Sequence, residues 1–421
     1  MAKRTLGLGK AAKAKKQKIA ETVESEIPEK SESPQLENEL TIQLNEEVDP
    51  NDDFAQLKAL YKTFTTSAKD SELVINGVIH ECDRILRNAE PKDVIPDYFY
   101  IIYGLSLNEL AKFHTENKEK LDEYFKAALE RIEDGLAKYE NNIGLLLAKS
   151  RILLNELTLV RVSPLTLESK AKEDEEKLSK LLDDALQVYE QAEDKAEESA
   201  EYELFDEDNL DLLTALDDLL DIVDNFGKDT LEGLDEDQEE DDIEDEVDLP
   251  FDHPLVSIRD DDRYNQWWRD HTHTFLENVD KHLKKNSDKK DELAHLRREI
   301  CRRLGQSYLQ EAELPSLVFT SLSYDDDYKD EEELHGLTSE EAQGAAQELI
   351  AQALKYLTQA EDKEEPETWV DIAEAMISLG NLYDVDSEEQ ESLYADAEAI
   401  LNKANNVTNG KYKDVLDNLL Q

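Results

Sequence analysis

The sequence predicts an all-α fold in which paired helices repeat along the chain after a disordered N-terminal tail. Apolar residues recur at helical spacing through most of the chain. Only 13 Gly and 10 Pro occur in 421 residues, so few positions interrupt that spacing. The pattern Leu-Gly-x-x-Tyr also occurs twice, each time followed by a helix with small residues at matching steps, which indicates a repeat.

The predicted disordered tail covers residues 1–50, which are poor in apolar residues and rich in charge. Its first eighteen residues, MAKRTLGLGKAAKAKKQK, contain seven Lys or Arg and no acid. Two basic clusters there have the spacing of a bipartite nuclear import signal, read by an import receptor: Lys3, Arg4, Lys15, Lys16 and Lys18. An RNA-contacting tail and a purely solubilising arm are the alternatives. A mitochondrial leader is disfavoured, because the tail has one Arg and acids begin at Glu21.

Residues 51–230 are predicted to form the N-terminal helical repeats, with order beginning near Asp52. One apolar face marks the helix at 71–90: Ile75, Val78, Ile79, Cys82, Ile85 and Leu86. Further helices are expected at 97–114, 118–138, 143–158, 173–198 and 206–229, with a break at Ser163-Pro164. Gly227 stands where the last of these helices needs a C-terminal cap.

Residues 231–254 are predicted to be an acidic linker, because eleven of the fourteen residues at 235–248 are Asp or Glu and repel one another. Residues 255–421 are predicted to form the C-terminal helical repeats, interrupted by a second acidic loop at 324–336. The expected helices are 258–285, 289–313, 339–360, 366–384, 387–405 and 411–420. Pro366 suits a first helical turn, and Ser387 with Gln390 has the spacing of a capping box.

The two Leu-Gly-x-x-Tyr copies, LGQSY at 304–308 and LGNLY at 379–383, are typical of the first helix of a tetratricopeptide unit. Small residues recur in the two partner helices: Ala346, Ile350 and Ala353, then Ala397, Leu401 and Ala404. In the second copy, one stripe of residues on the first helix is predicted to contact the partner helix: Trp369, Ile372, Ala373, Met376, Leu379 and Tyr383. A weaker version lies between 103 and 139. The sequence therefore predicts an irregular tetratricopeptide- or HEAT-like solenoid, with an irregular helical bundle as the alternative.

The formal net charge of −56 constrains the partners. Direct binding of the body to nucleic acid is not expected, because phosphate contacts draw on clustered Lys and Arg. The charge favours basic proteins and fast encounters with them at low salt, although solubility alone is an alternative explanation. The longest apolar stretch, at 98–107, is about half the length needed to cross a bilayer, so no membrane partner is expected.

Few residues could carry chemistry. Cys82 and Cys301 have no nearby cysteine, which suits a reducing compartment, and Cys82 lies on an apolar face as a core residue would. His271 and His273, with Glu277 one turn beyond, are the one close histidine pair, but a convincing third metal ligand is missing. The alternative is two structural histidines beside Trp267 and Trp268. We expect no catalytic residue, no cofactor and no metal site.

Several stretches resemble the fungal enhancer of translation termination family, from one end of the chain to the other. They are MAKRTLGLGK, LVINGVIHECDRILR (73–87), LDDLLDIVDNFGKD (216–229), PSLVFTSLSYDD (315–326), TWVDIAEAMISLGNLYD (368–384) and KDVLDNLLQ (413–421). The resemblance implies a non-catalytic, nuclear, all-α protein that supports accurate stop-codon termination. It also implies association with a 2-oxoglutarate-dependent prolyl dioxygenase that acts on a small-subunit ribosomal protein, and thus a part in hypoxia- or sterol-responsive transcription regulation.

Two functional hypotheses follow. The first is a nuclear adaptor that supports translation termination by binding other proteins, including the prolyl dioxygenase, with exchange to the cytoplasm left open. The second is an acidic chaperone or nuclear-import adaptor for a basic ribosomal protein. The acidic segments 235–248 and 324–333 are candidate docking sites for a basic client, with solvated linkers as the alternative.

Overall fold

The protein is all-α in its computed structural model. The structure describes residues 48–49, 51–67, 69–90, 92–172, 176–227, 249–285, 289–328, 331–413 and 415–416. Within these ranges there is no strand, and the β-pairing consists of one isolated bridge between Leu334 and Leu337. The predicted fold class is confirmed. In the same ranges no helix is long and apolar enough to cross a membrane.

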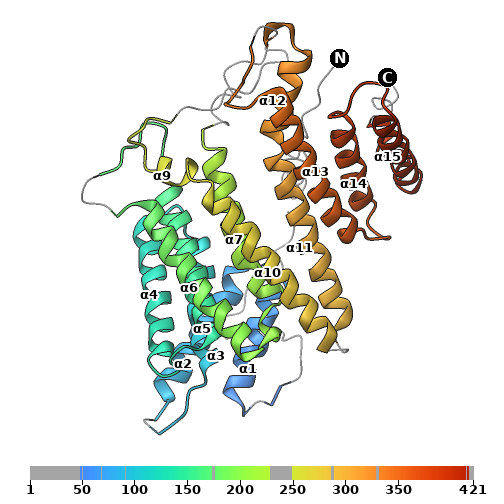
Figure 1. The fold of residues 1–421 in the computed structure, drawn as a ribbon. Coiled ribbons are helices and arrows are strands. Elements are labelled where there is room, and N and C mark those ends of the chain that lie inside the picture. Colours follow the sequence, from blue (N-terminus) through green and yellow to red (C-terminus); the bar gives the residue numbers. More distant parts are fainter. Residues whose placement is uncertain are drawn as a thin grey trace, which may run out of the picture.

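The N-terminal half consists of helices that pack against their neighbours in sequence (Figure 1). They are α1 (Asp53–Thr65), α2 (Glu72–Asn88), α3 (Asp97–Lys112), α4 (Lys118–Leu136), α5 (Ile143–Glu156), α6 (Leu178–Ser199) and α7 (Glu207–Asp224). A π-helix, η2 (Leu157–Val162), extends α5 to the predicted break, and a 3₁₀ turn, η3 (Tyr202–Leu204), precedes α7. The most extensive contacts are those of α3 with α4 and of α5 with α6.

The C-terminal half continues the arrangement with α9 (Val256–Arg259), α10 (Arg263–Lys285), α11 (Lys290–Glu311), α12 (Glu313–Tyr324), α13 (Ser339–Ala360), α14 (Pro366–Gly380) and α15 (Glu388–Val407). Its main pairs are α11 with α13 and α14 with α15. Figure 1 places α2 and α15 at opposite ends of an elongated molecule. Helices that contact mainly their neighbours are the arrangement of a helical-repeat solenoid.

Local capping explains where many helices begin. The side chains of Asp52, Ser71, Asn117 and Asn142 each accept a hydrogen bond from a backbone N–H in the first turn of α1, α2, α4 and α5. At α15 the Ser387 hydroxyl accepts from the N–H of Gln390, which is half of the predicted capping box, while the Gln390 side chain accepts from the N–H of Asp386. Pro366 opens α14 as predicted.

Two glycines allow close helix crossings. A Cβ atom on Gly305 of α11 would lie 2.6 Å from Leu357 Cγ and 3.3 Å from the backbone oxygen of Ala353 on α13. A Cβ on Gly104 of α3 would meet α4 in the same way, 2.6 Å from Ile132 Cδ1 and 3.3 Å from the Ala128 oxygen. The predicted close approach of a glycine on one helix to an alanine on its partner is thus present between α11 and α13. The same approach occurs between α3 and α4, in the weaker copy between 103 and 139.

The second Leu-Gly-x-x-Tyr copy differs from the prediction. Helix α14 ends at Gly380, so Leu382 and Tyr383 lie beyond it and pack with Ala346 and Ile350 of α13. The partner helix α15 is instead contacted from the middle of α14. Trp369 and Ala373 form a cluster with its buried residues Ala397, Leu401 and Ala404. Trp369, Ala373 and Met376 of the predicted stripe thus belong to the contact with α15. Ile372 instead clusters with Leu357 of α13, and Leu379 with Ala346 and Ile350 of the same helix.

Other elements also differ from the prediction: α10 begins at Arg263 rather than at 258, and α7 ends at Asp224 rather than at 229. Helix α12 was not expected, because Pro315 and the run of β-branched and aromatic residues after it obscure helical spacing. Pro315 lies in the first turn of α12, where a missing N–H costs nothing. Helix α6 begins at Leu178, after two non-helical residues, rather than at 173. Half of the helix expected at 411–420 falls outside the described residues.

The largest apolar core extends from Ile143 of α5 to Ala360 of α13. It contains Leu216 of α7, Trp268 of α10 and Ile300 of α11, so residues on both sides of the predicted acidic linker share one core. Smaller clusters surround α2 to α4 and α14 to α15. The domain boundaries given above stay a prediction.

Candidate partner-binding face

A set of ion pairs between charged side chains links five helices of the protein. We call it the charged row; its members are Lys69, Glu109, Lys112, Arg151, Asp211, Asp217, Arg302, Arg303 and Asp371. Ion pairs join α3 to α5, α5 to α7, α7 to α11 and α11 to α14. The row therefore extends across both halves of the protein.

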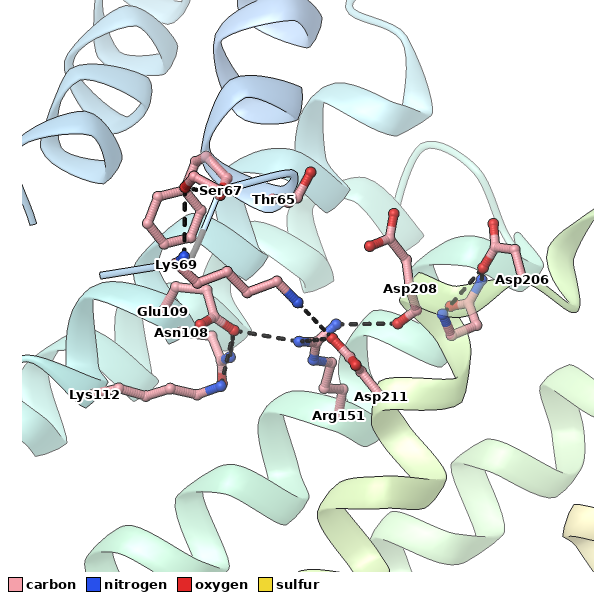
Figure 2. Close-up of polar contacts among 12 residues, drawn as sticks. Thr65, Ser67, Lys69, Asn108, Glu109, Lys112, Arg151, Asp206, Asp208 and Asp211 are labelled. Atoms are coloured by element: carbon pink, nitrogen blue, oxygen red, sulfur yellow. Dashed lines mark hydrogen bonds and ion pairs between the residues drawn. The ribbon is translucent and has the colours of Figure 1, made fainter. Parts of the chain in front are cut away.

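Arg151 of α5 is the centre of the row's N-terminal part (Figure 2). Its Nη2 lies 3.4 Å from Glu109 Oε1 of α3 and 3.1 Å from Asp211 Oδ2 of α7. Its Nη1 donates to the backbone oxygen of Asp208, 3.2 Å away. The side chains of Arg151 and Glu109 are 12% and 9% exposed, so most of this contact is shielded from water. A planar guanidinium suits such a three-way contact.

Two lysines make further contacts with the carboxylates that Arg151 binds. Lys69, in the connection between α1 and α2, has a left-handed backbone (φ 52°) and places its Nζ 2.8 Å from Asp211 Oδ2. Lys112 Nζ lies 3.0 Å from Glu109 Oε1, to which buried Asn108 also donates. The first helices are thereby tied to α7, although Lys69 and Asp211 are 142 residues apart in sequence.

Helix α7 presents an excess of negative charge to this face. We call Asp208, Asp211, Asp218 and Asp221 the α7 stripe; their spacing of three, seven and three residues places them on one side of the helix. Asp208, Asp218 and Asp221 are exposed. Burial raises the pKa of neighbouring Asp217 to about 6, against the opposing effect of Arg303 and with the support of Asp218 and Asp221. Burial also raises the pKa of Asp218, against the opposing effects of Arg303 and Lys112.

The residues predicted for import, Lys3, Arg4, Lys15, Lys16 and Lys18, lie outside the described residues, as does the acidic segment 235–248. The described part of the second acidic loop contains a 3₁₀ turn, η4 (Asp326–Tyr328), and a tight turn closed by two Leu334–Leu337 backbone hydrogen bonds of 3.0 Å. Leu334 and Leu337 pack on the α12–α13 core, which fixes the end of that loop.

The histidine pair has structural partners. His271 Nδ1 lies 2.6 Å from Glu193 Oε2 of α6, and the His271 ring lies 3.9 Å from that of Trp267. His273 lies 3.6 Å from Glu277 on its own helix. Among the described residues, no group of three His, Cys, Asp or Glu is placed to hold a metal ion. His271 thus belongs to the contact between α6 and α10, as in the alternative given above.

Both cysteines are fully buried thiols. Cys82 and Cys301 are 0% exposed and free of disulfides. Burial raises the pKa of Cys82 far above its usual range and that of Cys301 to about 11. Since the thiolate is the reactive form, neither position suits redox or nucleophilic chemistry. The interpretation of Cys82 as a core residue is confirmed.

Sequence reasoning missed the charged row. Its strongest local signal was Arg151, the only Arg in a helix whose other residues are largely apolar, IGLLLAKSRILLNE. The four Asp of the α7 stripe were a second signal, since they recur at helical spacing opposite the apolar face that was recognised. Neither signal identifies its partners, which come from distant helices.

These features define an elongated α-helical repeat protein whose neighbouring helices are joined by ion pairs. The chain belongs to the Nro1 family: the family model described as "Nuclear pore complex subunit Nro1" matches residues 1–420. Relatives named "Enhancer of translation termination 1" cover all of this chain and are themselves fully covered. Those from Scheffersomyces stipitis and Candida albicans are each 57% identical to it.

Two solved structures resemble this fold. One, described as the S. pombe nuclear import adaptor Nro1, has a TM-score of 0.51 at 16% identity and covers 87% of this chain and 98% of its own. The other, described as "The hypoxic regulator of sterol synthesis Nro1 is a nuclear import adaptor", has a TM-score of 0.52 at 17% identity. It covers 84% of this chain and 89% of its own, and both support the fold.

Proposed function

We propose that this protein is a nuclear adaptor without catalytic activity that binds a basic client protein along the α7 stripe. The observation that carries the proposal is an exposed set of carboxylates, Asp208, Asp218 and Asp221, on a helix fixed at the centre of the charged row. A rigid acidic surface loses little conformational entropy when it binds a basic partner. Its electrostatic field also raises the rate of association.

The client that fits this charge best is a basic ribosomal protein, and the basic tail would be read by a separate import receptor. The description of the similar solved structures as nuclear import adaptors supports this form of the proposal. The acidic body and the basic tail then have different partners, which explains why one chain carries both.

A second candidate function is support of translation termination together with a 2-oxoglutarate-dependent prolyl dioxygenase. The names of the relatives favour termination, and the words "hypoxic regulator" in one structure's description are in keeping with an oxygen-dependent partner. In this form the protein joins the dioxygenase to its ribosomal substrate, and translation is affected through the ribosome.

A native pull-down from cell extract tests the proposal, with partners identified by mass spectrometry at low and moderate salt. The test variant is Asp208→Asn/Asp218→Asn/Asp221→Asn. The matched control changes three exposed acids on α4, Glu119→Gln/Asp122→Asn/Glu123→Gln, so that net charge is equal. We expect wild type and control to recover a basic ribosomal protein that moderate salt removes, and the stripe variant to lose it. Equal recovery by all three would refute binding along α7, and recovery of a dioxygenase would favour the second candidate.

The import signal makes a separate prediction. Replacing Lys15, Lys16 and Lys18 by Ala should leave a fluorescently tagged protein largely cytoplasmic, because one of the two receptor grooves loses its ligands. The control is Lys10→Ala/Lys13→Ala, which removes charge from between the two clusters and should leave the protein nuclear. Nuclear accumulation of the first variant, measured by microscopy, would contradict the assignment.

A further inference from the structure

Ser323, near the end of α12, is followed closely by a run of acids. Asp325, Asp326 and Asp327 stand at the second, third and fourth positions after it. No other Ser or Thr in the chain has acids at all three of these positions. Acidophilic protein kinases select a hydroxyl with this arrangement, because basic side chains of the kinase pair with the carboxylates that follow it.

Ser323 lies at the surface, in the last turn of its helix. Its side chain is exposed, and so is that of Tyr324, the final residue of α12. At Asp325 the backbone is already extended (φ −94°, ψ 122°), and the two acids that follow are exposed. A kinase binds its substrate in an extended form, and the last turn of a helix opens at little cost. The hydroxyl can therefore reach a kinase while the core stays folded.

The hydroxyl of Ser323 is next to the start of α13. Its Oγ lies 2.8 Å from the Oγ of Ser339, the first residue of that helix, and α12 and α13 pack side by side (Figure 1). As at every helix start, the N–H groups of Ser339 and Glu340 have no acceptor within the helix, and they carry a partial positive charge. A negative group on Ser323 would therefore lie beside free donors.

Thr338 is a weaker match a short distance away. Acids stand only at the second and third positions after it, Glu340 and Glu341. Its hydroxyl is also occupied, because it donates to Glu341 Oε2 at 2.8 Å and accepts from the N–H of Glu341 at 3.3 Å. Phosphorylation there would break the capping box that begins α13, whereas Ser323 has no such role.

We propose that Ser323 is phosphorylated by an acidophilic serine/threonine kinase and that the phosphate then accepts hydrogen bonds from the start of α13. In this step Ser323 Oγ attacks the γ-phosphorus of ATP, the bond to the β,γ-bridging oxygen breaks, ADP leaves, and the hydroxyl proton passes to a base of the kinase. The phosphate supplies three acceptor oxygens for the N–H groups of Ser339 and Glu340. This goes beyond the proposed function, because the α7 stripe takes no part in it.

The test incubates the purified full-length protein with ATP and a purified acidophilic kinase, and mass spectrometry locates each phosphate. Ser323→Ala removes the acceptor, whereas Asp326→Asn keeps the acceptor and removes the acid at the third position. The matched control, Glu332→Gln, removes an exposed acid nine residues after Ser323. The protein is also purified from the cells that make it and analysed before and after phosphatase treatment.

We expect one phosphate on Ser323 in wild type and in Glu332→Gln, at equal rates, and none at this position in Ser323→Ala. Asp326→Asn should be phosphorylated at least about tenfold more slowly, because a charge-assisted contact with the kinase is lost. Protein from cells should carry the same phosphate, and phosphatase should remove it.

The contact with α13 has its own measurement. Amide hydrogen exchange at Ser339 and Glu340 should slow at least about fivefold when Ser323 is phosphorylated, since both N–H groups gain an acceptor. Phosphate mainly on another residue, equal rates for Asp326→Asn and wild type, or its absence from the cellular protein would overturn phosphorylation at Ser323. Unchanged exchange at the start of α13 would overturn the contact.

Discussion

Gly305 shows how one residue determines a helix contact. Its α-carbon faces Leu357 and the Ala353 carbonyl so closely that an added methyl group must displace α13. Gly305→Ala should therefore lower the free energy of unfolding by about 1–2 kcal/mol, since the cost of overpacking exceeds the gain in helix propensity. Chemical denaturation measures this.

The matched control is Gly344→Ala in α13, where nothing lies within 4 Å of an added Cβ. There only helix propensity changes, and the free energy of unfolding should rise by about 0.5–1 kcal/mol. The same sign for both substitutions would contradict the close crossing of α11 and α13.

Glu374 of α14 is a residue whose burial makes stability depend on pH. Burial, with a smaller effect of Asp371, raises the pKa of Glu374 to about 7. The folded protein then binds more protons than the unfolded chain between about pH 4.5 and 7, so this group's contribution to stability falls as pH rises through that window.

Glu374→Gln should remove that dependence. At pH 8 we expect the variant to be more stable than wild type by about 1–2 kcal/mol, after allowance for solvent screening, and at pH 4 the two should be equal. Denaturation curves at both pH values measure the difference. A constant difference across pH would show that Glu374 titrates normally.

At the scale of elements, the contact of α3, α5 and α7 depends on Arg151. Removing it by Arg151→Met leaves the Glu109 carboxylate, 9% exposed, with Lys112 as its remaining cation. We expect the free energy of unfolding to fall by about 2–4 kcal/mol, because an undercompensated buried charge is costly.

Adding Glu109→Gln to Arg151→Met should recover part of the loss, since the second change removes the stranded charge. A double-mutant cycle by urea denaturation measures the coupling between the two residues. Strictly additive losses would mean that the 3.4 Å contact contributes nothing to holding the helices together.

The helices that were predicted correctly are those whose apolar spacing and caps lie within their own stretch of sequence. Helix α2 is predictable because Ile75, Val78, Cys82 and Ile85 repeat at helical spacing and Ser71 caps it. Helix α12 was missed because its Pro315 is normally read as a helix break, although in a first turn it is harmless. Helix α14 was drawn four residues too long because LGNLY was taken as helical throughout.

At the scale of the whole molecule, the candidate face could not be predicted because its contacts join residues that are distant in sequence. Arg151 with Asp211, and Lys69 with Asp211, span 60 and 142 residues. No periodic pattern contains such pairs. The net charge leads us to expect a basic partner, but it does not indicate which of many carboxylates lie together on one helix.

The central claim concerns the whole molecule: a chain with net charge −56 binds its client through one particular set of acids. A general field would attract basic proteins to any acidic surface, and three substitutions anywhere would have the same small effect. A docking surface on α7 instead requires that the position of the substituted acids decides the affinity.

The most direct measurement is the Kd of the purified basic client for wild type, the α7 stripe variant and the α4 control, each by calorimetry at 50 and 200 mM salt. We predict that the stripe variant binds at least about tenfold more weakly than the control at both salt concentrations, with a smaller salt dependence than wild type. Equal Kd values for the two variants would contradict the account, because net charge alone would then explain the binding.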